Sequence, residues 1–232
     1  MKHVGYFRAS WIVAAKDLRL EWHTFESLSS SFIFSLIVLV IFNFAFGFST
    51  IKQLGAERLV PGVVWTVLGF AAVVSVARSM QIEQRRDTLA ALFMAPIDRG
   101  ALFTGKFLAN LVKNIILQWI VVVLAAVFFN FDLVAVAAPM FLVLFLHGLG
   151  LTELGTLFAA IAARVGRGEA LLATLLFPAS TPLFISAVKC TASLLEGKGL
   201  GGEAGNWLMI TIGFDVLYFL VALATFEFVL EE

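Results

Sequence analysis

Charged residues are scarce in this sequence. Lys, Arg, Asp and Glu together make up 14% of the 232 residues, whereas about 25% is usual for a soluble domain. A soluble chain covers its surface with polar side chains, and this supply is too small to do so. The charges also balance, with 16 basic and 16 acidic residues. No basic surface for nucleic acid is therefore indicated.

Cysteine and histidine are also scarce. Cys190 is the single cysteine, which excludes an intrachain disulfide, a CxxC redox pair and a CxxCH haem attachment site. The three histidines are His3, His23 and His147, and none belongs to a metal-ligand spacing such as HExxH. No metal site is predicted. Too few polar residues lie beside any apolar segment to build a catalytic site, so no catalytic residues are predicted either.

Apolar residues, by contrast, are abundant and grouped into long runs. They make up 61% of the chain, and the mean hydropathy is +0.99. A helix needs about 20 apolar residues to cross a bilayer core roughly 30 Å thick. Six segments satisfy this, so the sequence predicts an all-α polytopic membrane protein with a single transmembrane domain over residues 1–232. The predicted spans are 28–51, 59–77, 107–131, 133–163, 170–188 and 206–226.

The distribution of Lys and Arg predicts the orientation. If the N-terminus is inside, the inner segments hold twelve basic residues and the outer segments hold four. Inner loops of membrane proteins carry the excess of positive charge. Both termini are therefore expected in the cytoplasm. Lys113, close to the start of the third span, is expected to extend its amine to the lipid headgroups.

The first 27 residues have the pattern of an interfacial helix. One helical stripe is apolar and the charged residues lie off it. A basic helix with tryptophan at its edges that leads into a span is typical of a membrane surface, and an amphipathic linker helix is the alternative. The stripe consists of Phe7, Trp11, Ala14, Leu18 and Trp22.

Residues 78–106 form the largest predicted cytoplasmic segment. Its first part is rich in charged residues, its middle part (89–95) is apolar, and Pro96 then ends the predicted helix. Asp98 then has the position of an N-cap for the helix that enters the third span. Such a helix can dock a soluble partner or lie flat on the membrane. The residues assigned to ATPase coupling are Glu83, Arg85, Arg86, Leu89, Leu92, Phe93 and Pro96.

The heptapeptide 100–106, GALFTGK, matches part of a phosphate-binding loop. Phe107 occupies the position of the magnesium-binding hydroxyl, and no buried strand precedes the motif. We therefore expect no nucleotide to bind here, and the chain has no room for an ATPase domain.

Three polar residues are expected inside the membrane. Asp215 lies near the middle of the last span, where a charge costs about 2.5–3.5 kcal/mol and needs a partner. Candidate partners are His147, a protonated Glu153, or backbone near Gly148 and Gly150. His147 is either an interhelical hydrogen-bonding group or a haem ligand or proton relay. A separate set of small residues, expected to pack helices closely, is Gly155, Ala159 and Ala163.

Several segments resemble the haem exporter protein B family (CcmB), the ABC-2-type permease subunit of cytochrome c maturation. KDLRLEW resembles the run before the first span of that family, and VPGVVW resembles the start of its second span. LAALFMAP resembles its ATPase-contacting segment, and FDVL and FEFVLEE resemble its C-terminal part. These five segments are residues 16–22, 60–65, 89–96, 214–217 and 226–232.

The resemblance implies a subunit without its own ATPase site, in a bacterial inner membrane. It implies a second copy of the chain, an ATPase (CcmA-like), membrane subunits (CcmC-like and CcmD-like) and a periplasmic haem chaperone (CcmE-like). ATP would be bound by the partner and haem handled by the complex, with no cofactor assigned to this chain. The alternatives are an ABC-2 exporter of a lipid, glycan or drug, and an ATP-independent carrier or scaffold.

Overall fold

The structure is a computed structural model that describes residues 5–85, 98–165 and 168–231. All regular elements within these ranges are α-helices, which confirms the predicted all-α class. They are α1 (Tyr6–Thr24), α2 (Glu26–Leu54), α3 (Ala56–Arg85), α5 (Arg99–Phe129), α6 (Leu133–Val165), α7 (Gly168–Leu195) and α8 (Gly202–Glu231).

Six of these helices are long and apolar enough to cross a membrane, as expected for a polytopic protein. The shortest candidate span has 22 residues, which at 1.5 Å per residue covers a hydrocarbon core of roughly 30 Å. The candidate spans are Glu26–Gly47, Ala56–Ser79, Arg99–Phe129, Leu133–Ala163, Ala170–Leu195 and Gly202–Phe226.

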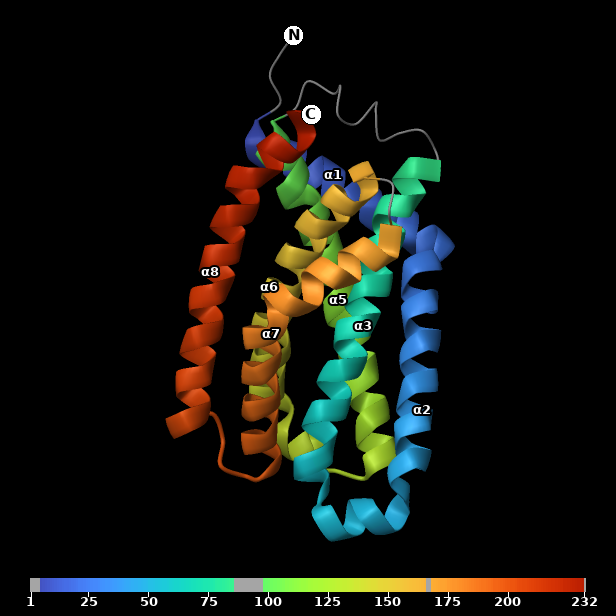
Figure 1. The fold of residues 1–232 in the computed structure, drawn as a ribbon, viewed down its shortest axis with the longest axis vertical. Coiled ribbons are helices and arrows are strands. Elements are labelled where there is room, and N and C mark those ends of the chain that lie inside the picture. Colours follow the sequence, from blue (N-terminus) through green and yellow to red (C-terminus); the bar gives the residue numbers. More distant parts are fainter. Residues whose placement is uncertain (1–4, 86–97, 166–167, 232) are drawn as a thin grey trace.

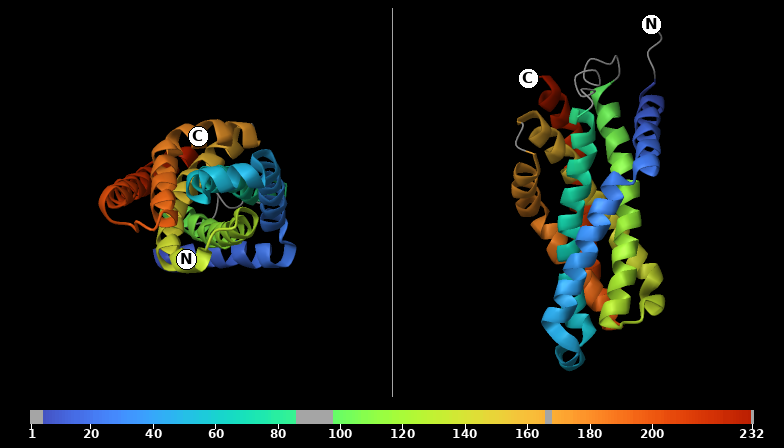
Figure 2. Two further views of the ribbon diagram at one scale, coloured as in Figure 1. Left: turned by 90° about the horizontal axis from the view of Figure 1, so that it is seen from below. Right: turned by 90° about the vertical axis from the view of Figure 1, so that its right-hand side faces the viewer.

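The six long helices run alternately up and down in one elongated bundle (Figure 1). We call one end of this bundle the α1 end, because α1 lies there together with the last turns of α3 and α8 and the start of α5. The other end is the distal end. Figure 2 shows α1 running obliquely along the outside of the bundle next to α5. The first span thus begins and the last span ends at the same end of the bundle, as an even number of spans requires.

The first span ends earlier than the sequence predicts. The apolar run continues to Ile51, but Gly47 takes φ 64° and ψ 160°, which breaks α2. This backbone region is essentially restricted to glycine. The chain continues helically to Leu54 in a new direction, across the distal end (Figure 1). Hydropathy does not detect such a break, since the residues on both sides of it are apolar.

Two apolar clusters form the interior of the bundle. One cluster is built around Trp65, Leu117 and Leu144, all at most 1% exposed, and draws on α2, α3, α5, α6, α7 and the start of α8. The other contains Phe103 of α5, whose ring centroid lies 5.1 Å from that of Phe226 on α8. This second cluster seats α8 against the start of α5.

All three aromatic residues of the predicted α1 stripe are exposed rather than packed against the bundle. Phe7, Trp11 and Trp22 are 87%, 68% and 52% exposed, whereas Ala14 is buried. These exposed rings are available to an apolar surrounding such as the membrane interface. The face of α1 that contacts the protein consists of Ala9, Ser10, Val13, Ala14, Asp17 and Glu21.

Candidate functional site

A buried ion pair joins α1 to α5. Lys106 Nζ lies 3.1 Å from Asp17 Oδ2, and the two side chains are 3% and 8% exposed. The helices approach closely here because Gly105 has no side chain. A Cβ atom at Gly105 would lie 2.6 Å from the carbonyl oxygen of Ser10. The acidic Asp17 of α1 is therefore turned inward, against the start of the third span, while the basic Arg8, Lys16 and Arg19 stay exposed.

Lys113 adds a second cation to the same region. Its side chain is only 3% exposed, and it interacts electrostatically with Glu21 and Asp17 of α1. The prediction that Lys113 extends to the lipid headgroups is therefore wrong. The acidic residues of α1 hold the amine inside the protein, two turns further into α5 than Lys106.

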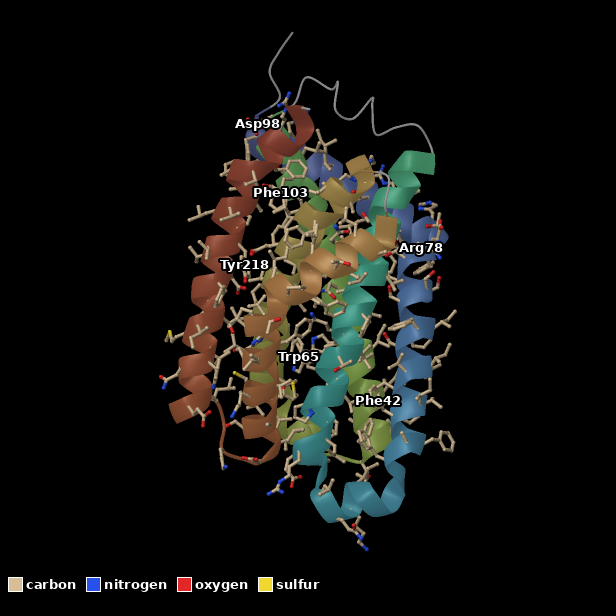
Figure 3. The ribbon with its side chains drawn as sticks, in the orientation of Figure 1. Phe42, Trp65, Arg78, Asp98, Phe103 and Tyr218 are labelled. Carbon is tan, nitrogen blue, oxygen red and sulfur yellow. The ribbon has the colours of Figure 1, made fainter. Side chains whose placement is uncertain are left out.

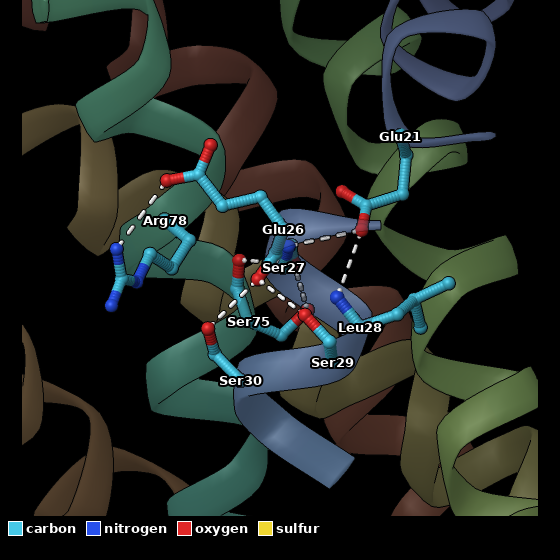
Figure 4. A network of polar contacts seen from close by, with 8 residues as sticks. All are labelled: Glu21, Glu26, Ser27, Leu28, Ser29, Ser30, Ser75 and Arg78. Carbon is cyan, nitrogen blue, oxygen red and sulfur yellow. Dashed lines mark hydrogen bonds and ion pairs between the residues drawn. The ribbon is translucent and has the colours of Figure 1, made fainter. Parts of the chain in front are cut away.

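The corner between α1 and α2 is held by the carboxylate of Glu21 (Figure 4). Its Oε1 accepts hydrogen bonds from the backbone N–H groups of Ser27 (3.0 Å) and Leu28 (2.8 Å). These are first-turn amides that have no partner within α2. Ser27 Oγ in turn donates to the Ser75 carbonyl oxygen of α3, at 3.1 Å. The buried Glu21 carboxylate thus links α1 to α2, and the Ser27 hydroxyl links α2 to α3.

A ladder of polar side chains continues between α5 and α6. Asn110 Nδ2 donates to Thr156 Oγ1 at 3.1 Å, and Asn114 Nδ2 donates to Thr152 Oγ1 at 3.0 Å. Gln118, one turn further, is fully buried, and its amide lies against Gly148 of α6. These residues were not among the predicted site residues. The spacing of four from Lys106 to Asn110, Asn114 and Gln118 is the signal that could have revealed them.

His147 lies at the centre of a second polar group, beyond the ladder. Nδ1 lies 2.7 Å from the Val143 carbonyl oxygen, and Nε2 lies 3.1 Å from Ser186 Oγ and 3.2 Å from Thr211 Oγ1. The imidazole packs against the Trp65 ring at a centroid distance of 5.2 Å; Figure 3 shows Trp65 directed into the bundle. His147 was predicted either to form interhelical hydrogen bonds or to act as a haem ligand or proton relay. In the structure it forms interhelical hydrogen bonds, which join α6 to α7 and α8.

Asp215 and Glu153 lie on facing helices. Asp215, on α8, is 7% exposed, and neither carboxylate oxygen has a hydrogen-bond partner among the described residues. Of its proposed partners, His147 is engaged elsewhere, whereas Gly150 is in close contact: a Cβ there would lie 2.5 Å from Asp215 Oδ1. Glu153 is 4% exposed and interacts electrostatically with Asp215.

The predicted small-residue face of α6 lies partly against α3. A Cβ at Gly155 would be 3.3 Å from Val76 Cγ2, so the absence of a side chain lets the two helices approach. Ala159 is 2% exposed and Ala163 is half-buried. These contacts are the kind that small residues make in membrane helix packing.

Most of the residues assigned to ATPase coupling lie outside the described part of the chain. Glu83 and Arg85 are in the last turn of α3, while Arg86, Leu89, Leu92, Phe93 and Pro96 fall within 86–97. The N-cap prediction for the next helix is confirmed. Asp98 Oδ1 accepts a hydrogen bond from the Ala101 N–H at 3.1 Å, and Figure 3 shows Asp98 at the α1 end.

The GALFTGK motif forms no phosphate-binding loop. Its residues are the first turns of α5, and its lysine is the Lys106 that pairs with Asp17. Within the described ranges, no group of three or more His, Cys, Asp or Glu side chains is placed to hold a metal ion. Three sets of polar side chains in this bundle connect helices: α1 to α5, α5 to α6, and α6 to α7 and α8.

Comparison with known proteins identifies the chain. No curated protein matches the sequence significantly. One protein-family model, described as CcmB protein, matches residues 8–230, which is nearly the whole chain. The match reaches into each of the described helices and includes the buried α1–α5 contact as well as the Asp215 helix. The chain therefore belongs to the CcmB family, the membrane permease component of haem export for cytochrome c maturation.

Proposed function

We propose that this chain couples ATP hydrolysis on a separate, CcmA-like ATPase to haem export and release of the haem chaperone in cytochrome c maturation. The family match over residues 8–230 is the observation that carries this proposal. The six-helix bundle supports it, since a permease component needs membrane-spanning helices and polar side chains join neighbouring helices of this bundle.

The α1 end supports a mechanical role. α3 ends there and α5 begins there, so the segment 78–106 is attached to both helices at this end. α5 is in turn tied to α1 through the Asp17–Lys106 pair, and α1 to α2 through Glu21. A force applied by a closing ATPase at 83–96 would move α3 and α5 together with α1, because a broken buried ion pair costs about 3–5 kcal/mol.

The proposal includes the orientation and the partners. The α1 end faces the cytoplasm of a bacterial inner membrane, because most Lys and Arg residues lie in the segments at this end. A second copy of the chain, CcmC-like and CcmD-like membrane subunits and a CcmE-like periplasmic chaperone complete the complex. ATP is bound by the ATPase subunit, and haem is handled by the assembly.

The first test is co-purification of the tagged chain from native membranes, followed by mass spectrometry. Recovery of an ABC ATPase with a haem-handling membrane protein supports the maturation complex. Recovery of an ATPase alone would favour an ABC-2 exporter of a lipid, glycan or drug. Recovery of neither would favour an ATP-independent carrier or scaffold and would contradict the proposal.

The second test reverses the charge of the coupling segment. Arg85→Glu combined with Arg86→Glu should reduce ATPase recovery by about tenfold or more, which corresponds to a loss of about 1.4 kcal/mol. The matched control is Lys52→Glu combined with Arg58→Glu, an identical charge change at exposed positions of the distal end. Equal ATPase recovery for both double variants would show that this segment is not the coupling site.

A further inference from the structure

The carboxyl group of Asp215 has neither a hydrogen-bond donor nor an ion-pair partner among the described residues to stabilise a negative charge. It lies near the middle of the α8 span, is 7% exposed, and has two oxygens without a hydrogen-bond partner among the described residues. Inserting an ionised carboxylate at such a position costs about 2.5–3.5 kcal/mol of free energy, even on the lowest insertion scales. Native proteins neutralise such a group with a cation, with hydrogen bonds or with a proton.

The side chain of Asp215 is directed at α6, where a second unsatisfied carboxyl group lies. Gly150 of α6 is so close to Asp215 Oδ1 that an added Cβ would lie 2.5 Å from it. Glu153 follows one turn later, is 4% exposed, and its Oε2 has no hydrogen-bond partner in the described ranges. The two acids interact electrostatically. If both were ionised, two like charges would face each other in an apolar interior.

Each titratable side chain that packs nearby is engaged elsewhere. On α6, His147 bonds Ser186 and Thr211 through Nε2. On α8 itself, the Tyr218 hydroxyl donates to the Ala179 carbonyl oxygen of α7, at 2.6 Å.

The lysines of α5 and α7 do not neutralise the acids either. Lys106 and Lys113 on α5 interact with the acidic residues of α1. Lys189 on α7 pairs at an exposed position with Glu203 of α8. No described cation is therefore left to compensate Asp215.

Neither a partner protein nor a metal ion fits this position. Asp215 is already covered by atoms of its own chain, so a cationic side chain of another subunit cannot reach it without separating α8 from α6. Hard metal ions require about six or more oxygen ligands, whereas the Leu183 side chain fills the space beside Gly150 and Asp215. A proton needs only one carboxylate oxygen and occupies no additional volume.

We propose that Glu153 and Asp215 form a proton-binding site between α6 and α8. The pair takes up at least one proton from water, an O–H bond forms on a carboxylate oxygen, and the charge of the pair falls from −2 to −1 or to zero. Loss of that proton restores two facing negative charges and weakens the contact between α8 and α6. This proposal concerns the chemistry of the chain itself and stands whether or not the ATPase coupling above is correct.

Infrared spectroscopy of the purified chain in lipid nanodiscs tests this directly. A protonated carboxyl group has a carbonyl stretching band that ionised carboxylates lack, and that band shifts in deuterated water. At about pH 7, where an unperturbed Asp or Glu is ionised, the wild-type protein should show this band. Combined Glu153→Gln and Asp215→Asn should remove it, because the amides imitate the neutral acids in shape while carrying no acid proton.

The matched control is Glu203→Gln, since Glu203 lies on the same helix but is 73% exposed and paired with Lys189. This variant should retain the band. Should the double variant fail to elute as a folded species, each single variant must still reduce or shift the band. A wild-type spectrum without the band, or a band unchanged by these substitutions, would overturn the proposal. Disappearance of the band when sodium replaces choline would indicate a metal cation site instead, and would overturn it equally.

Discussion

At the scale of single residues, the most consequential contact is Asp17 with Lys106. Both side chains are almost fully buried, and a charge without its partner in such a place is strongly unfavourable. Either residue without the other would therefore destabilise the folded protein. Together they fix the position of α1 on α5.

Lys106→Met should lower the free energy of unfolding by up to about 3–5 kcal/mol, because the Asp17 carboxylate loses its buried partner and keeps only the exposed Lys16 amine, at 3.1 Å, and the electrostatic interaction with Lys113. Adding Asp17→Leu should recover part of this loss, since it removes the carboxylate that has lost its buried partner. Thermal or denaturant unfolding in detergent measures both effects. Lys189→Met is the control, because its pair with Glu203 is exposed and should contribute little. Equal destabilisation by Lys106→Met and Lys189→Met would contradict this account of the buried pair.

His147→Gln should leave c-type cytochrome assembly close to wild type. Both imidazole nitrogens are used in hydrogen bonds within the bundle, and a glutamine amide can replace part of them. Haem staining of membrane cytochromes measures the outcome. A variant that is present at normal levels but makes no c-type cytochrome would instead support the reading of His147 as a haem ligand.

At the scale of helices, two of the close approaches depend on missing side chains. α1 meets α5 at Gly105, and α6 meets α3 at Gly155. Glycine at such positions brings backbones together and lets polar groups on adjacent turns find their partners. The Asp17–Lys106 pair lies beside one of these approaches.

Gly105→Ala should loosen α1 from α5. The added Cβ would be 2.6 Å from both the Ser10 carbonyl oxygen and Val13 Cβ, neither of which is the end of a flexible side chain. Faster proteolysis within residues 6–24 and a lower unfolding temperature are expected. Gly213→Ala on α8 is the control, because nothing lies within 4 Å of its Cβ position. That substitution should be neutral or stabilising by up to about 1 kcal/mol. If the two alanine variants were equally stable, the close contact at Gly105 would be refuted.

The helices could be predicted from sequence much more completely than their contacts. Long apolar runs revealed the spans because the bilayer requires them, and Asp98 was identified as an N-cap from its local context. The break at Gly47 was missed, since hydropathy does not register backbone conformation. Lys113 was assigned to the headgroups because its partners, Glu21 and Asp17, are about 90 residues away in sequence and meet it only in the folded bundle.

At the scale of the whole molecule, an even number of spans places α1 and the end of α8 at the same end. Thiol labelling of intact cells can assign that end. Cys190 is fully buried, so the background is low. In the Lys198→Cys variant, the new thiol should react with a membrane-impermeant maleimide added outside intact cells. In the Arg8→Cys variant, the new thiol should react only after lysis. The reverse pattern would show that the α1 end faces outward.

The buried contact between α1 and α5 also sets an order for biogenesis. During synthesis, Asp17 and Glu21 emerge about 90 residues before Lys106 and Lys113. Until the third span has entered the membrane, the cation in contact with this acidic face of α1 is the exposed Lys16 amine next to Asp17, so the face stays in water, since its burial without Lys106 would be too costly. Docking of α1 is therefore a late event that can occur only on a nascent chain with its first three spans inserted.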